Sequence, residues 1–171
     1  MNWDLATNII LGSAILILGI FVVLGLYQWI TRKSLKKVDK VILCMIIPLI
    51  LMVLVYVLCD KILPHFIDMP TRPDGSGEPS FPSTHVMVTC TIFCLVAYVL
   101  PHYLHSRTLC AIIWILMATL TVLCTAGRVI ANKHSVVDVI GGLGFAVIFT
   151  IIYVLIVKKF TTSNHKKEQN E

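Results

Sequence analysis

Five long apolar stretches, separated by short polar segments, dominate the hydropathy pattern of this chain. A helix of about 20 apolar residues crosses the hydrocarbon core of a bilayer, and most of these stretches reach that length. The third is the shortest, and we expect its helix to begin near Ser83. The pattern predicts an all-α, integral membrane bundle of about five transmembrane helices. The stretches run over about Leu5–Ile30, Val41–Cys59, Val86–Leu100, Leu109–Gly127 and Val136–Val157.

Proline and glycine mark the expected irregularities. Pro48 predicts a kink in the second span. The segment Lys61–His85 holds five prolines, so it cannot be helical throughout and must form an ordered or mobile loop. Three glycines in the fifth span, at positions 141, 142 and 144, favour close helix packing. We expect one transmembrane domain over residues 1–160, with a motif-bearing core at 41–157 and a polar C-terminal tail at 161–171.

Composition supports the membrane assignment. Hydrophobic residues make up 57% of the chain and charged residues 13%, whereas soluble domains are about 25% charged. The net charge of +5 does not predict nucleic acid as a partner, because the basic residues form short runs between apolar stretches. The six cysteines lie in or at the end of apolar runs and predict neither a disulfide framework nor a metal site.

The distribution of Lys and Arg predicts the orientation. With five spans, ten of the 14 basic residues fall on one side, which the positive-inside rule makes cytoplasmic. The N-terminus is then outside and the C-terminus inside. We expect a multi-pass protein of a bacterial plasma membrane, with its active site facing outside. The ten are Arg32, Lys33, Lys36, Lys37, Lys40, Arg107, Lys158, Lys159, Lys166 and Lys167.

Two predicted outer segments, Lys61–His85 and Gly127–Asp138, hold the residues that phosphoryl transfer requires. Such a reaction needs fixed positive charge and hydrogen-bond donors around the phosphoryl oxygens. It also needs a nucleophile and an acid for the leaving oxygen. Candidates for these roles are Arg72, Arg128, Ser83, His85, His134 and Asp138.

Local spacing suggests how these residues are placed. His134 and Asp138 are four residues apart, so on a helix they share a face, and the carboxylate could accept the ring N–H of His134. Ser83 is a good N-cap for the third span, whose first backbone N–H groups would face an anion. Spacing alone does not decide which histidine is the nucleophile and which the acid.

The candidate residues also have interpretations that do not involve catalysis. The histidines and Asp138 could cap helices at the interface, and the two arginines could bind anionic lipid headgroups. Lys133 fits a solvated charge. The three loop carboxylates Asp68, Asp74 and Glu78 fit turn chemistry or solvation better than catalysis.

In these motifs the chain resembles the type-2 phosphatidic-acid phosphatase family of membrane lipid phosphatases, which includes small bacterial undecaprenyl-diphosphate phosphatases. The family patterns are K-x6-R-P, P-S-G-H and S-R-x5-H-x3-D. This chain has Arg72-Pro73, then Pro82-Ser83-Thr84-His85, then Arg128-x5-His134-x3-Asp138, in the same order. Each motif alone is weak, but the three together on one side of a bundle are specific.

The resemblance implies roles for the matching residues. His134 would be the nucleophile that forms a phosphohistidine, Asp138 its orienting carboxylate, and His85 the general acid. The phosphoryl oxygens would be bound by Arg72, Ser83, Thr84 and Arg128. The family's chemistry is metal-independent, so no metal or cofactor is expected.

The chain departs from the family pattern at several positions. Thr84 replaces a Gly, which would either narrow the approach to the phosphate or add a hydroxyl donor. Gly127 replaces a Ser. The family Lys falls on His65, and Lys61, one helical turn earlier, could reach the same place if the second span continues that far. The family commonly has six spans, whereas we count five.

The resemblance implies a lipid phosphate or diphosphate as the substrate. We favour undecaprenyl diphosphate, converted to undecaprenyl phosphate at the outer face, where that carrier is released. The alternatives are phosphatidylglycerophosphate, phosphatidic acid, or an inactive relative that binds or transports phospholipid. A channel would need more polar residues deep in the spans. The sequence makes no prediction of an oligomeric state.

Overall fold

The computed structural model describes residues 2–34 and 38–168, with residues 161–168 described by their backbone alone. Its regular elements are helices, and five helical stretches are long and apolar enough to cross a membrane. The predicted all-α membrane bundle of five spans is therefore confirmed. The helices are α1 (Trp3–Arg32), α2 (Lys40–Leu43), α3 (Ile46–Val57), the π-helix η2 (Leu58–Ile62), the 3₁₀-helix η3 (Leu63–His65), α4 (Thr84–Tyr103), α5 (Arg107–Ile130) and α6 (Val136–Glu168).

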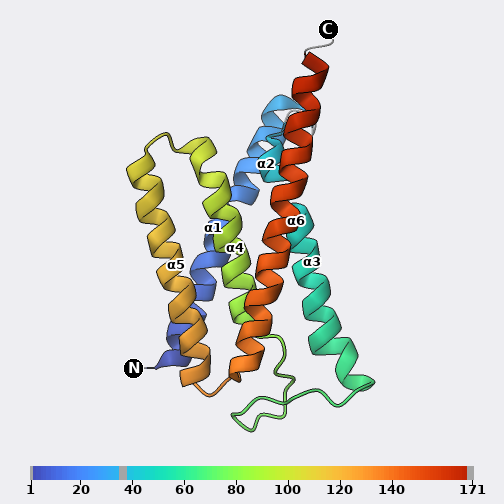
Figure 1. Cartoon of the computed structure of the whole chain (residues 1–171), viewed down its shortest axis with the longest axis vertical. Coiled ribbons are helices and arrows are strands. Elements are labelled where there is room, and N and C mark those ends of the chain that lie inside the picture. The colour runs from blue at the N-terminus through green and yellow to red at the C-terminus, as the bar shows by residue number, and fades with distance from the viewer. Residues whose placement is uncertain (1, 35–37, 169–171) are drawn as a thin grey trace.

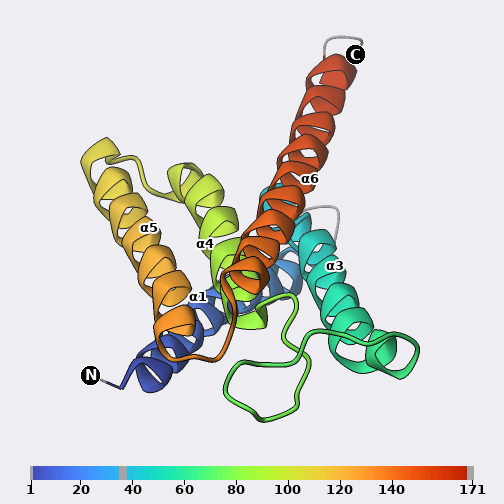
Figure 2. The ribbon, with the colours of Figure 1, turned by 60° about the horizontal axis from the view of Figure 1, so that its bottom comes forward.

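Helix α4 is the centre of the bundle and the most buried of the five spans. It packs against α1, α5 and α6, while α3 lies on the far side of α6 (Figure 1). The N-terminus, the long loop between η3 and α4, and the turn between α5 and α6 all lie at one end of the bundle (Figure 2). The C-terminal part of α6 lies at the opposite end and continues helically into the predicted polar tail.

The second span is interrupted near its start. The chain makes a turn at Cys44 and Met45, between α2 and α3. Pro48 lies in the first turn of α3 and has no N–H for the carbonyl of Cys44, so a continuous helix cannot close there. The irregularity predicted from this proline is confirmed, and it falls four residues before the proline itself.

The predicted end of the second span at Cys59 is wrong. The helical path continues through η2 and η3 to His65. Asp60 and Lys61 appeared to end the apolar run, but their side chains form an ion pair of 2.7 Å with each other. The two charges therefore compensate each other where the helical path leaves the apolar run.

A polar cluster joins three elements at the opposite end of the bundle. Gln28 of α1 and Asp39 exchange two hydrogen bonds of 2.9 Å, and the hydroxyl of Tyr103 in α4 donates to Asp39 at 2.7 Å. The adjacent predicted basic residues Lys36 and Lys37 lie outside the described part of the chain. The cluster fixes the end of α1 against α4.

The proline-rich loop is ordered and folds back on itself. Thr71 and Pro79 form an isolated antiparallel bridge, and the N–H of Arg72 donates to the carbonyl of Glu78 at 2.9 Å. Gly75 has a φ of 78°, in the left-handed region that glycine adopts without a steric penalty. The turn at this glycine returns the chain toward α4.

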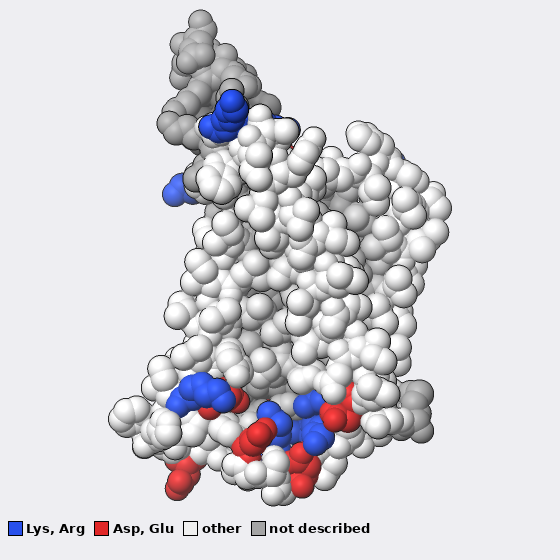
Figure 3. All heavy atoms as spheres, turned by 180° about the vertical axis from the view of Figure 1, so that it is seen from behind, with Lys and Arg blue, Asp and Glu red and all other residues white. Residues whose placement is uncertain are grey.

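Charged side chains gather at the two ends of the molecule, and the middle carries none on the face shown in Figure 3. This uncharged middle region corresponds to the apolar middle of the five spans. The end that carries both acidic and basic side chains is the end that holds the N-terminus and the long loop.

Helix α6 approaches the start of α4 at Gly142. A Cβ added at this position would lie 2.8 Å from the backbone oxygen of Ser83 and 3.3 Å from the backbone nitrogen of Met87. Backbone atoms cannot move aside cheaply, so the two helices depend on this glycine for their separation. Gly144, two residues later, has nothing within 4 Å of an added Cβ.

We expect Gly142→Ala to lower the free energy of unfolding by about 1–3 kcal/mol, because the methyl group overpacks the α4–α6 contact. The matched control Gly144→Ala should leave it unchanged or raise it by up to about 1 kcal/mol, since alanine favours a helix. Equilibrium unfolding in mixed detergent micelles measures both. Equal effects of the two substitutions would contradict this account of the packing.

Candidate active site

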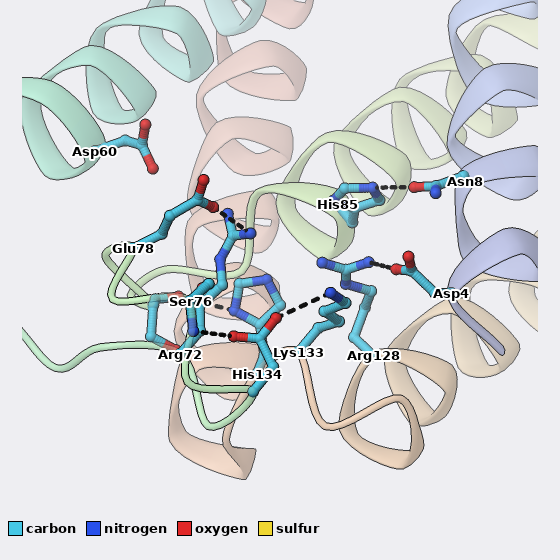
Figure 4. A network of polar contacts seen from close by, with 12 residues as sticks. Asp4, Asn8, Asp60, Arg72, Ser76, Glu78, His85, Arg128, Lys133 and His134 are labelled. Atoms are coloured by element: carbon cyan, nitrogen blue, oxygen red, sulfur yellow. Dashed lines mark hydrogen bonds and ion pairs between the residues drawn. The ribbon is translucent and has the colours of Figure 1, made fainter.

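A cavity of about 440 Å³ opens at the end of the bundle that carries the long loop. Both predicted catalytic histidines line it, although 49 residues separate His85 from His134 in the chain. Figure 4 shows them among charged side chains that include Asp4, Arg72 and Arg128. The cavity is lined by Leu11, Tyr56, Asp60, Lys61, Arg72, Glu78, Pro79, Thr84, His85 and His134.

His134 lies in the turn that precedes α6 and is 3% exposed. Its Nδ1 is 2.9 Å from the backbone oxygen of Ser80, which can only accept. Nδ1 therefore carries the hydrogen in the neutral ring, and Nε2 keeps its lone pair. An imidazole held in this tautomer has one nitrogen available for nucleophilic attack.

Burial lowers the pKa of His134 to about 4, and the nearby positive charge of Arg128 acts in the same direction. The hydrogen bond to Ser80 and the carboxylate of Asp138 oppose this shift only in part. The ring is consequently neutral at physiological pH, which is the protonation state that a nucleophile needs.

The predicted hydrogen bond between Asp138 and His134 is wrong. The carboxylate of Asp138 accepts from the hydroxyl of Ser80 and, at 2.7 Å, from the backbone N–H of Ser135. Because Ser80 also holds the ring of His134 through its carbonyl, Asp138 acts on the histidine through Ser80. Asp138 is 2% exposed, so its carboxylate is buried and bonds to two segments of the chain that form the site.

The reason for this difference lies at the start of α6. Helix α6 begins at Val136, so His134 is outside the helix and does not share a helical face with Asp138. Ser135 and Asp138 cap the helix reciprocally, since the hydroxyl of Ser135 accepts from the N–H of Asp138 at 3.3 Å. The spacing S-x-x-D in the sequence is the signal for such a capping box.

Three of the predicted phosphate-binding residues keep buried hydrogen-bond donors without a protein partner. These donors are Nε of Arg72, Nε of Arg128 and the hydroxyl of Ser83. Ser83 is the N-cap of α4, but its side chain makes no capping bond. Buried donors are satisfied in most native sites, so three in one region indicate a place for an anion.

Each arginine also contacts a carboxylate. Nη1 of Arg128 lies 2.8 Å from Oδ1 of Asp4 in α1, and Arg72 pairs with Glu78 in the long loop (Figure 4). These pairs use the terminal nitrogens and leave the Nε atoms free. The arginines are therefore held in position with the Nε–H of each guanidinium still available.

His85 lies in the first turn of α4. Its Nε2 is 2.7 Å from the side-chain oxygen of Asn8 in α1. Thr84, which replaces the family Gly, is half-buried and lines the cavity beside it. The third span begins with Ser83 as its N-cap, as predicted.

Lys61 and His65 differ in their position relative to the cavity. Lys61 lines the cavity, where its Nζ pairs with Asp60 and lies 5.9 Å from the ring centre of Tyr56. His65 is exposed and is not among the lining residues. Of the two candidates, Lys61 is the one that lines the cavity, and the second span continues past it.

Asp74 and Lys133 join the two loops at the rim. Oδ1 of Asp74 accepts from the N–H of Ser76 at 3.0 Å, and Oδ2 lies 2.9 Å from Nζ of Lys133. The lysine, followed by the bonds from Ser76, holds the pKa of Asp74 well below its usual range. Asp74 has the turn role that the sequence favours. Lys133 was interpreted as a solvated charge, but its side chain pairs with Asp74.

Sequence reasoning missed several residues of this site. Four residues contact a predicted functional side chain, although the sequence analysis assigned them no role in the site. They are Asp4, Asn8, Glu78 and Ser80. The signal for the first two was their spacing of four in an otherwise apolar span, since polar side chains within a span usually have a partner. Among the described residues, no group of three or more His, Cys, Asp or Glu side chains is arranged to hold a metal ion.

Comparisons with known proteins show the family of the chain and a similar fold. A family model described as the PAP2 superfamily matches residues 37–162, which is most of the chain. Among solved structures, the chain is similar to one described as the first transmembrane PAP2-type phosphatidylglycerolphosphate phosphatase, from Bacillus subtilis. The two are 24% identical with a TM-score of 0.62, and the match covers 94% of this chain and 77% of that one. None of the curated proteins compared with the chain matches it significantly.

The family match contains the cavity's two histidines, both arginines and Asp138, in the motif order described above. The chain therefore belongs to the PAP2 superfamily, the type-2 phosphatidic-acid phosphatases, and is a phosphoric ester hydrolase built as a multi-pass membrane protein.

Proposed function

We propose that this enzyme hydrolyses a lipid phosphate or diphosphate through a phosphohistidine on His134. The observation that carries the proposal is the combination of three unpartnered buried donors, on Arg72, Ser83 and Arg128, with a neutral imidazole whose Nε2 keeps its lone pair. The donors suit the equatorial oxygens of a phosphoryl group, and the imidazole suits attack on phosphorus.

The reaction then has two steps. Nε2 of His134 forms a bond to phosphorus while the bond from phosphorus to the leaving oxygen breaks, and His85 gives a proton to that oxygen. In the second step water attacks phosphorus, the N–P bond breaks, and His85 takes a proton from the water. Arg72 and Arg128 stabilise the negative charge in both steps, and no metal is required.

A second, apolar pocket supports a lipid as the substrate. It has a volume of about 160 Å³ and lies between α3 and α4, where Met52, Val53 and Val88 line it. Tyr56 and Thr84 line both this pocket and the polar cavity. A headgroup in the polar cavity would therefore place the beginning of its tail against apolar side chains at membrane depth.

For the substrate we propose undecaprenyl diphosphate, with the site facing outward. The basic segments after α1, between α4 and α5, and after the apolar part of α6 fall at the end of the bundle opposite the cavity. The positive-inside rule places that end in the cytoplasm and the cavity outside. Phosphatidylglycerophosphate and phosphatidic acid are the competing substrates.

We expect His134→Ala to lower phosphate release by at least about 10³-fold, because the proposed N–P bond to this ring can then no longer form. The measurement is phosphate release by the purified enzyme in detergent with EDTA, from undecaprenyl diphosphate, phosphatidylglycerophosphate and phosphatidic acid. His105→Ala, an exposed histidine outside the cavity, is the matched control and should keep full activity. Release by His134→Ala at the wild-type rate would refute the mechanism, and no release by the wild type would favour a lipid-binding relative.

The pH dependence tests the protonation state of the nucleophile. Since the pKa of His134 is lowered to about 4 and only the neutral ring attacks, the acidic limb of kcat/KM should lie near pH 4. A free histidine would place it near 6.5. The profile is measured with correction for ionisation of the substrate. A limb at pH 6.5 or above would contradict the neutral resting state.

The orientation has its own test. A green fluorescent protein fused after Glu171 should fluoresce, because the C-terminus is expected in the cytoplasm, and alkaline phosphatase fused at the same residue should be inactive. The reverse pattern for the two reporters would place the cavity in the cytoplasm. The substrate proposal would then lose its argument, while the proposed chemistry would be unaffected.

A further inference from the structure

Helix α1 lies outside the part of the chain that the family model matches, which begins at residue 37. Three polar residues lie near its N-terminal end on one face, because positions 4, 7, 8 and 11 of a helix lie along one stripe. Leu11, the next member of the stripe, lines the active-site cavity. The polar residues are Asp4, Thr7 and Asn8.

All three polar side chains are turned to α4 and α5. Asp4 pairs with Arg128 at 2.8 Å, and the hydroxyl of Thr7 lies 3.5 Å from the same arginine nitrogen. Asn8 contacts His85, with its oxygen 2.7 Å from Nε2 (Figure 4). Both partners belong to the proposed machinery of phosphoryl transfer.

The approach of α1 depends on a departure from the family pattern. A Cβ at Gly127 would lie 2.6 Å from Cγ2 of Thr7 and 3.3 Å from the ring of Trp3. The Ser of the family motif would therefore collide with α1 as it lies here. Glycine next to Arg128 lets α1 come close enough for Asp4 and Asn8 to reach the site.

From this geometry we infer that Asn8 is a positioning residue for His85, an inference that rests on the proposed function. The amide oxygen only accepts, so the contact keeps a hydrogen on Nε2 and fixes the rotation of the ring. Nδ1 is then the nitrogen that gains and loses the proton exchanged with the leaving oxygen and with water. The charged or titratable groups around His85 are Asp4, Arg72, Arg128 and His134, so Asn8 supplies a neutral acceptor among two arginines, one carboxylate and a second imidazole.

The test removes the hydrogen-bond acceptor of Asn8 and keeps a side chain of similar size. Asn8→Leu should lower kcat/KM by about 10–100-fold, since a misplaced acid or base costs this much. Asn8→Asp retains an oxygen in the same place and should recover most of the activity. The matched control Ser13→Ala lies on the same helix, where its hydroxyl bonds only to the carbonyl of Ile10, and should have no effect. If Asn8→Leu does not fold, Asn8→Ala takes its place.

A mutant cycle separates positioning from a merely structural role. If Asn8 acts through His85, adding Asn8→Leu to His85→Ala should cause no further loss of kcat/KM. Additive losses, or full activity of the single Asn8→Leu variant, would overturn the inference.

A spectroscopic readout makes the inference independent of activity. In ¹⁵N-histidine spectra of the wild type, the His85 ring should be the Nε2–H tautomer, and Asn8→Leu should shift it toward a mixture. An unchanged tautomer would overturn the inference even if the phosphatase reaction is confirmed. A shifted tautomer in a protein without phosphatase activity would instead refute the proposed function alone.

Discussion

The site depends on one buried residue, Asp138, whose carboxylate and backbone oxygen together join three segments of the chain. It caps α6 through Ser135, and it accepts the hydroxyl of Ser80, whose carbonyl orients His134. The backbone oxygen of Asp138 also accepts from the N–H of Ser83 at 2.9 Å, at the start of α4. A buried carboxylate is unfavourable unless its oxygens are satisfied, so these bonds and the local fold require one another. The long loop, α4 and α6 are thereby held in one arrangement around the cavity.

Much of the fold follows from the hydropathy pattern alone, because a bilayer leaves few alternatives to spanning helices. The five spans, the irregularity caused by Pro48 and the start of α4 at Ser83 were predictable for this reason. The end of the second span was not, because the helical path continues past Asp60 and Lys61, whose side chains pair with each other. A hydropathy value describes the transfer of one residue at a time from water to an apolar phase. It therefore takes no account of an ion pair between two residues.

The sequence allowed the two histidines to be chosen as candidates, but it did not allow their contacts to be predicted. Motif order identified both histidines, and the structure brings them to one cavity. The partner of His134 was not predictable, because a spacing of four implies contact only if both residues lie in the helix, and the cap at Ser135 excludes the histidine. The contacts of Asp4 with Arg128 and of Asn8 with His85 span more than 70 residues of sequence. They depend on how α1 packs, which no local pattern describes.

The ion pairs in and near the cavity suggest how an anion would be exchanged there. At this end of the bundle the described basic residues Lys61, Arg72, Arg128 and Lys133 each have a carboxylate partner. Partly exposed pairs of this kind are worth only about 0–1 kcal/mol, so replacing a carboxylate by a phosphoryl group costs little. The pair of the buried Arg128 differs, because removing its partner would leave a charge uncompensated. We therefore expect the substrate to displace Glu78 from Arg72 while Asp4 stays on Arg128, so that one arginine adapts to the phosphate and the other stays fixed by α1.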